Sequence, residues 1–332
     1  MSTIPSRSAM VYVSRQMRAY FAPVDRCTET PAVFDPGLYG KFPLSMAPSP
    51  WVDLGWIENF QRTYETPTQP VRAGAKGLPC TQFRGPLEGR VEFDFQQWGK
   101  LQMALAGGSE HMNVLAPVAG STTPVASGGT PAPAAAVLAG STASQLVLGT
   151  GVVGGFPVGT LLAVDVDYQQ QVGYVGTGIS AAYVSSAIAV KQDPNYVRRV
   201  TFNVGRVAQV TAASVLLAQP LLGGVPPAGA SAQAVVAFVD REGGSFFQEW
   251  SALFVAEEES GGRVCFYYPR LSPNPGVSSG KFMREQVTEI AKPCSTIGLH
   301  ASFLALPYVD ENDGQTVLCY RSYFPAPLAA IY

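Results

Sequence analysis

Two short glycine motifs resemble signatures of catalysis or cofactor binding. The first, Gly276, Ser278 and Gly280, matches G-x-S-x-G, in which a strand and a helix hold the serine as a nucleophile. Two prolines stand where that strand would run, and no aspartate lies between Ser278 and His300, the only histidine downstream. The segment is therefore predicted to be an exposed loop, and hydrolysis by Ser278 remains an alternative.

The second motif, Gly149, Gly151 and Gly154, matches G-x-G-x-x-G. A dinucleotide site needs a helix that opens at the third glycine, so that its N-terminus faces the pyrophosphate. Here Gly155, a proline and Gly159 follow instead. The motif is interpreted as a β-turn, and no cofactor is predicted.

Asp165 and Asp167 lie two residues apart in a predicted strand. They therefore share one face, where their carboxylates could hold a hard cation. No further oxygen ligands accompany them in the sequence, so a solvated face is the favoured interpretation and no metal is predicted.

The five cysteines form no C-x-x-C pair, and the two histidines, His111 and His300, lie near no cysteine pair; the cysteines are Cys27, Cys80, Cys265, Cys294 and Cys319. Zinc is therefore disfavoured. Widely spaced single cysteines predict reduced, buried thiols in a protein made in the cytoplasm.

Runs of charge are few. Glu257–Glu259 precede a Ser-Gly-Gly sequence and predict a solvated turn, or alternatively part of an acidic channel or a contact with a basic partner. The pairs Arg198-Arg199 and Arg241-Glu242 are interpreted as ion pairs at the surface or between subunits.

Aromatic residues gather in two places, and both an ordinary core and a subunit interface account for them. The clusters are Trp51, Trp56, Phe60 and Tyr64, then Phe246, Phe247, Trp250 and Phe254. The candidate inter-subunit contacts are Trp51, Trp56, Phe60, Tyr64, Arg72 and Trp250. No constellation amounts to an active site, so no enzyme is predicted.

The elements around these residues are predicted to be strands. Val91, Phe93 and Phe95 alternate with charged residues, as in a strand with one buried face. A short helix should follow and stop at Gly107-Gly108. Near the end of the chain, two apolar runs flank a turn with Asp313-Gly314 and predict a hairpin; Leu299, Ala301, Phe303 and Ala305 share one face of its first arm.

Composition narrows the class of protein. Only 14% of the 332 residues are charged, against about 25% in ordinary soluble domains. The 34 glycines and 27 prolines favour a turn-rich all-β protein with one or two short helices. A net charge of −2 provides no excess of positive charge that would attract nucleic acid or anionic lipid.

The chain should contain no secretory signal and no membrane helix. Arg7, Arg15 and Arg18 interrupt the apolar residues near the start. Residues 111–164 lack Lys, Arg, Asp and Glu, but glycine and proline break them throughout.

Local composition and strand patterns divide the chain into four zones. Residues 1–50 are rich in proline and predict an extended arm, and residues 116–143 predict a Gly/Pro/Ala-rich linker. Residues 51–115 and 236–332 should form a β-sandwich or barrel core, into which a small β module over 144–235 is inserted.

The order of these elements resembles the major tail (tail tube) proteins of bacteriophages. The resemblance covers about half the chain and rests on WVDLGWIENF, GRVEFDFQQWGKLQMALAGGSEHMNVL, RVCFYYPRL and GLHASFLALPYVDENDGQTVLCYRSYFP. The inserted 144–235 module departs from the minimal family pattern.

The resemblance implies a structural virion protein. Subunits would pair sheet edges into rings, expected to be hexameric, that stack through the loop after residues 51–60 and the N-terminal arm. DNA would pass through the lumen during ejection without sequence-specific contact. Sheath, tape-measure, terminator and baseplate proteins are the implied partners, and the tail of the virion is the implied location. The alternatives are a capsid decoration or head–tail joining protein, or a carbohydrate-binding or hydrolytic β protein.

Overall fold

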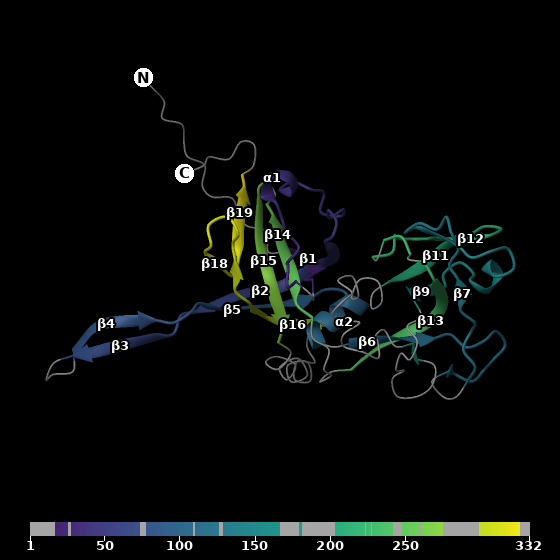
Figure 1. Ribbon diagram of the computed structural model, residues 1–332, viewed down its shortest axis with the longest axis horizontal. Coiled ribbons are helices and arrows are strands. Elements are labelled where there is room, and N and C mark those ends of the chain that lie inside the picture. Colours follow the sequence, from purple (N-terminus) through teal and green to yellow (C-terminus); the bar gives the residue numbers. More distant parts are fainter. Residues whose placement is uncertain are drawn as a thin grey trace, which may run out of the picture. The chain divides into compact units, whose positions relative to one another are not determined.

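The computed structural model describes residues 17–25, 28–73, 78–108, 110–125, 129–166, 179–180, 203–222, 224–226, 228–241, 248–258, 261–274 and 299–325. The chain divides into two compact units. Residues 1–24, 31–108 and 248–332 belong to the first, here called the barrel unit, and residues 25–30 and 109–247 to the second, the inserted unit. Strands dominate both units (Figure 1), which confirms the all-β prediction.

The barrel unit is built on a closed ring of six antiparallel strands. Their order is β14 (Trp250–Glu257), β1 (Met17–Pro23), β2 (Val52–Glu65), β5 (Glu88–Phe95), β16 (Leu299–Ala305) and β15 (Arg263–Pro273), and pairing of β14 with β15 closes the ring. A seventh strand, β19 (Tyr320–Phe324), pairs with the first half of β15 outside the ring. Closure leaves the six ring strands without a free edge.

Aromatic rings fill the inside of the barrel. Phe93 and Phe303 stack with centroids 5.7 Å apart, and Phe21 meets Phe254 edge-on at 5.8 Å. All four are fully buried. The predicted alternation along Val91, Phe93 and Phe95 is confirmed, because all three side chains point inward while the charged residues between them remain partly exposed.

Residues 31–51, here called the strap, cover the outer face of β1, β14 and β15. Phe34, Phe42 and Trp51 of the strap are buried in one cluster with Tyr20 and Tyr267 of the barrel. The strap contains the short helix α1 (Pro36–Tyr39), capped by the side chain of Asp35. These strands are therefore covered on both faces, by the aromatic interior of the barrel on one side and by the strap on the other.

The prediction of an extended arm over residues 1–50 is therefore wrong from Met17 onward. Residues 17–23 are a ring strand between β14 and β2, and residues 31–50 pack on the barrel. The prolines limit regular structure in this segment, but they do not prevent it from burying aromatic side chains. Residues 1–16 lie outside the described part of the chain.

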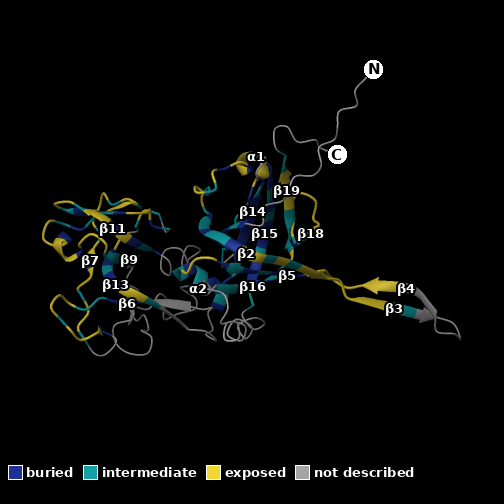
Figure 2. Ribbon diagram, turned by 180° about the vertical axis from the view of Figure 1, so that it is seen from behind, coloured by how far each residue is buried: buried dark blue, intermediate teal, exposed yellow. Residues whose placement is uncertain are grey.

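A hairpin continues the pairing of β2 with β5. Its strands are β3 (Thr68–Ala73) and β4 (Leu78–Arg84), and its described residues are mostly exposed (Figure 2). The predicted helix is α2 (Lys100–Gly107), which packs against β16 and ends at Gly108 with φ of 56°. This confirms the predicted stop signal, because glycine tolerates the left-handed conformation.

The predicted C-terminal hairpin is correct only near its turn. β17 (Tyr308–Val309) and β18 (Thr316–Val317) pair across the Asp313-Gly314 turn. The longer runs on either side do not pair with each other, because β16 lies between β5 and β15 while β19 lies on β15 alone.

The described strands of the inserted unit form one sheet. Their order is β10 (Ile179–Ser180), β6 (Glu110–Leu115), β13 (Ala230–Arg241), β9 (Leu161–Val166), β11 (Val204–Val210), β12 (Ser214–Leu217) and β8 (Gln145–Val147), with β7 (Ala135–Ala136) beside β13. Its core includes Leu146, Leu162 and Val215.

This unit is larger than the predicted 144–235 module. It begins near residue 109 and ends near 247, because β6 pairs with β13 and both belong to it. The segment 116–143, predicted to be a linker, contributes β7 and the buried Val125 and Ala135 to the unit. Small side chains there permit close packing and need not indicate a linker.

Candidate functional site

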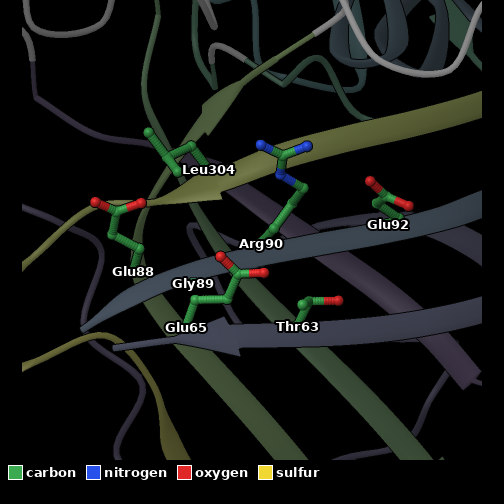
Figure 3. A pocket seen from close by; sticks show the side chains of 7 residues that line it. All are labelled: Thr63, Glu65, Glu88, Gly89, Arg90, Glu92 and Leu304. Carbon is green, nitrogen blue, oxygen red and sulfur yellow. The ribbon is translucent and has the colours of Figure 1, made fainter. Parts of the chain in front are cut away.

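The barrel unit has a polar outer face formed by β2, β5 and β16. Glu88, Arg90, Glu92 and Asp94 alternate along β5 with the inward Val91, Phe93 and Phe95, and therefore point outward. Thr63, Glu65, Glu88, Gly89, Arg90, Glu92 and Leu304 line a shallow pocket of about 270 Å³ on this face (Figure 3). We call this surface the acidic face.

Carboxylates outnumber cations on the acidic face. Glu65 of β2 lies directly opposite Glu88 of β5 in the register, a like-charge pair that weakens strand pairing. Arg90 is the cation that lines the pocket between these glutamates and Glu92 (Figure 3). The arrangement gives the wall of the pocket a net negative charge.

A hydrogen-bonded cluster lies on the same three strands. His300 Nδ1 lies 2.7 Å from Asp94 Oδ1, and Asn59 Nδ2 donates to Asp94 Oδ2 at 2.6 Å. Burial acts to raise the pKa of Asp94, but the hydrogen bonds from His300 and Asn59 and the charge of His300 outweigh it, so that the pKa lies below its ordinary value. Asp94 is therefore held as a carboxylate.

Asn59 sets the side-chain alternation of β2. Its φ of 52° falls in the left-handed region, and the register with β5 shifts between Glu58 and Gln61. Such a bulge adds one residue and changes which side chains face inward. As a result, Ile57 faces the interior before the bulge, whereas Phe60 and Arg62 face it afterwards and contact Phe254 and Tyr268.

Arg62 lies at one end of the barrel among aromatic residues. Its guanidinium lies 4.4 Å from the centre of the Phe266 ring, and its Nε donates to the Tyr268 hydroxyl at 2.5 Å. It also donates to the hydroxyl of Tyr64, which lies 2.9 Å from that of Tyr268. Arg62 and Tyr64 line an open groove of about 850 Å³ together with residues of β18 and β19.

The six candidate inter-subunit contacts lie in different environments. Trp51 and Trp250 are buried within the barrel unit, which favours the core interpretation for these two residues. Phe60 is partly buried against Phe254, and Trp56 lies beneath the guanidinium of Arg18. Tyr64 lines the groove, and the side chain of Arg72 lies outside the described residues.

The motif residues fall in several places. Gly149 begins a turn followed by a 3-10 turn over Val153–Gly155 and then by β9, so no α-helix opens there. Ser278 and Asp167 lie outside the described residues, as does the side chain of Asp165. Among the described residues, no group of three or more His, Cys, Asp or Glu side chains is placed to hold a metal ion.

The remaining charged motifs and the cysteines are only partly described. Glu257 pairs with Arg263 at 3.1 Å and Glu258 is buried, so these residues form a turn that is less solvated than predicted. Arg198-Arg199, Glu242 and the side chain of Arg241 lie outside the described residues. Cys265 and Cys319 are free thiols, and Cys265 is buried as expected. The side chains of Cys27, Cys80, Cys294 and His111 are not described.

Sequence reasoning missed the acidic face and the Arg62 cluster. The alternation along β5 contained the signal for the first, because its polar residues must share the face opposite the core. Arg62 gave no local signal, since its position depends on the bulge at Asn59.

Comparison of the sequence with protein-family models and with curated proteins finds no match to either. In the described part of the chain, no helix is long and apolar enough to cross a membrane.

Proposed function

We propose that this chain is a structural subunit, with no enzymatic role, that assembles with copies of itself into the tail tube of a bacteriophage. Copies would form rings, expected to be hexameric, and the rings would stack into a conduit for DNA ejection. Sheath, tape-measure, terminator and baseplate proteins are the partners that such a tube would meet in the virion tail.

The observation that carries this proposal is the acidic face. The strap covers the opposite side of the barrel, whereas Glu65, Glu88 and Glu92 line an open pocket on β2 and β5. A wall of carboxylates repels phosphates and so prevents DNA from adhering as it passes. We assign the acidic face to the lumen of the tube.

The β3–β4 hairpin supports assembly. An isolated two-stranded hairpin is marginally stable in water, and the described strands β3 and β4 pair only with each other. Residues 66–87 contain Arg72, Lys76 and Arg84 but no Asp or Glu. We assign this hairpin to the contact between stacked rings, where a neighbouring subunit would cover it.

Negative-stain electron microscopy of the purified protein over a concentration series tests the proposal. Rings or hollow tubes of uniform width are expected. Discrete trimers or single rings that do not stack would favour a decoration or joining protein. A compact monomer at every concentration, together with its absence from virions, would overturn the proposal.

A further inference from the structure

The groove beside Arg62 has the features of a binding site for a charged segment. Arg62 and Tyr64 of β2 and Leu87, just before β5, line one side of it, and Leu318 and Arg321 of the β18–β19 segment line the other. Its volume of about 850 Å³ is within the range of protein sites that enclose a ligand. Cationic and apolar side chains both line it.

Arg62 is fixed in place without a carboxylate to balance its charge. Two tyrosine hydroxyls and the ring of Phe266 hold the guanidinium. Among the described residues, no carboxylate lies within ion-pair distance of Arg62 or of Arg321. A partly buried guanidinium that neighbouring aromatic residues already orient is the kind of residue that dominates protein interfaces.

The same unit presents an acidic turn without basic partners. Residues 310–315 connect β17 to β18, and Asp310, Glu311 and Asp313 in this connection are exposed. Asp310 is held by the Tyr320 hydroxyl at 2.6 Å, which orders the turn. No described Lys or Arg lies within ion-pair distance of these carboxylates.

We propose that the groove of one subunit receives the turn over residues 310–314 of a neighbouring copy, whose carboxylates bind Arg62 and Arg321. The choice of a second copy as partner rests on the proposed function, which requires contacts between identical subunits. A contact between two unlike surfaces repeats from copy to copy and so builds rings or filaments.

A second feature places the partner beside β19. Of the described strands, only β15 pairs with β19, so one edge of β19 keeps unpaired main-chain groups. Arg321 belongs to β19 and lines the groove. A turn seated in the groove therefore lies next to an edge strand that can pair with another chain.

Nucleic acid is the less suitable occupant. Glu65 and Glu88 lie on the same two strands as the groove residues, and the chain carries a net charge of −2. A polyanion would meet repeated repulsion there, whereas a short turn presents few carboxylates. The apolar Leu87 and Leu318 also favour a polypeptide.

Charge reversal and its rescue test this contact in the full chain. Arg321→Glu should raise the protein concentration needed for half-maximal assembly, followed by light scattering, by about tenfold or more. Adding Glu311→Arg to that variant should restore assembly. Lys41→Glu, at an exposed position of the strap, makes the same change of charge and should have little effect.

Arg62→Gln should weaken assembly as Arg321→Glu does, and thermal unfolding of the dilute monomer would show whether each variant is folded.

If the wild type assembles and folded Arg321→Glu assembles equally well, the groove contact is overturned while the proposed function stands. If Glu311→Arg fails to rescue, the turn is not the occupant. If the wild type never assembles, both proposals fail. Retention of duplex DNA that is lost in Arg62→Gln would identify a phosphate site instead.

Discussion

The hydroxyl of Tyr267 on β15 donates a hydrogen bond to the main-chain oxygen of Ala32, 2.9 Å away, across 235 positions of sequence. The main-chain nitrogen of Ala32 donates to the hydroxyl oxygen of Ser251 at 2.9 Å. Barrel side chains therefore satisfy both polar main-chain groups of one strap residue. The strap is held by directed bonds as well as by the apolar cluster beneath it.

Tyr267→Phe should destabilise the barrel unit by about 1 kcal/mol, because the ring remains packed while the Ala32 oxygen loses its donor. Denaturant unfolding followed by tryptophan fluorescence measures the change. Tyr323→Phe is the matched control, since the Tyr323 side chain is 51% exposed. Equal stability of the two variants would show that the bond contributes nothing.

Gly40→Ala should destabilise the protein by about 1–3 kcal/mol through overpacking. A Cβ at Gly40 would lie 2.1 Å from Phe324 Cε1 and 2.6 Å from the main-chain oxygen of Pro36. Its φ of −55° suits any residue, so the cost is steric. Gly151→Ala meets no atom within 4 Å and serves as control. Thermal unfolding should separate the two, and a Gly40→Ala midpoint equal to the wild type would contradict the packing described.

Stability should fall in acid partly through Asp94. Its pKa in the folded protein lies below the ordinary value of 3.8, so its carboxylate stabilises the fold above that value and this contribution is lost as the pH falls through the folded pKa. Asp94→Asn lacks this titration. Unfolding free energies measured from pH 6 down to pH 2 should decline less steeply in the variant, and parallel curves would refute the assignment.

Cys265 should resist alkylation in the native protein. Burial raises the pKa of its thiol to about 12, so almost no thiolate exists at pH 8. Mass spectrometry after iodoacetamide treatment should find Cys265 unmodified in buffer and modified in denaturant. Rapid modification in buffer would mean that β15 opens readily.

The acidic face should prevent the assembled protein from retaining DNA. Reversing Glu88 and Glu92 to Lys should make assembled protein retain duplex DNA at low salt, with retention decreasing as salt rises. Glu29→Lys changes charge in the same direction at an exposed position outside the barrel unit and should not do so. Co-sedimentation measures retention. Equal retention by both variants would contradict the assignment of the acidic face to the lumen.

Features set by local patterns were predictable from sequence. The alternation along β5, the helix that ends at Gly108 and the turn at Asp313-Gly314 each depend on neighbouring residues, and the structure contains all three. The polar residues of the same alternation, Glu88, Arg90 and Glu92, line the acidic face, so this face also follows from the local pattern along β5.

Features set by distant contacts were not predictable. The strap depends on side chains such as Tyr267 and Arg263, which bind its main chain from more than 200 residues away. The position of Arg62 depends on the bulge at Asn59. Asparagine tolerates the left-handed conformation but also occurs in many other settings, so its presence in a strand does not by itself predict a bulge. Pairing of β19 with β15 rather than β16 likewise follows from closure of the ring.

The ring order also dictates when the barrel can form during synthesis. β1 needs β14 as a neighbour, and β5 needs β16, so the strands made first wait until residues beyond 299 have left the ribosome. The inserted unit, complete by residue 247, is available for folding much earlier. The inserted unit can therefore fold during translation before the barrel closes. Because the barrel pairs strands that are distant in sequence, its closure is expected to be the slow step in folding.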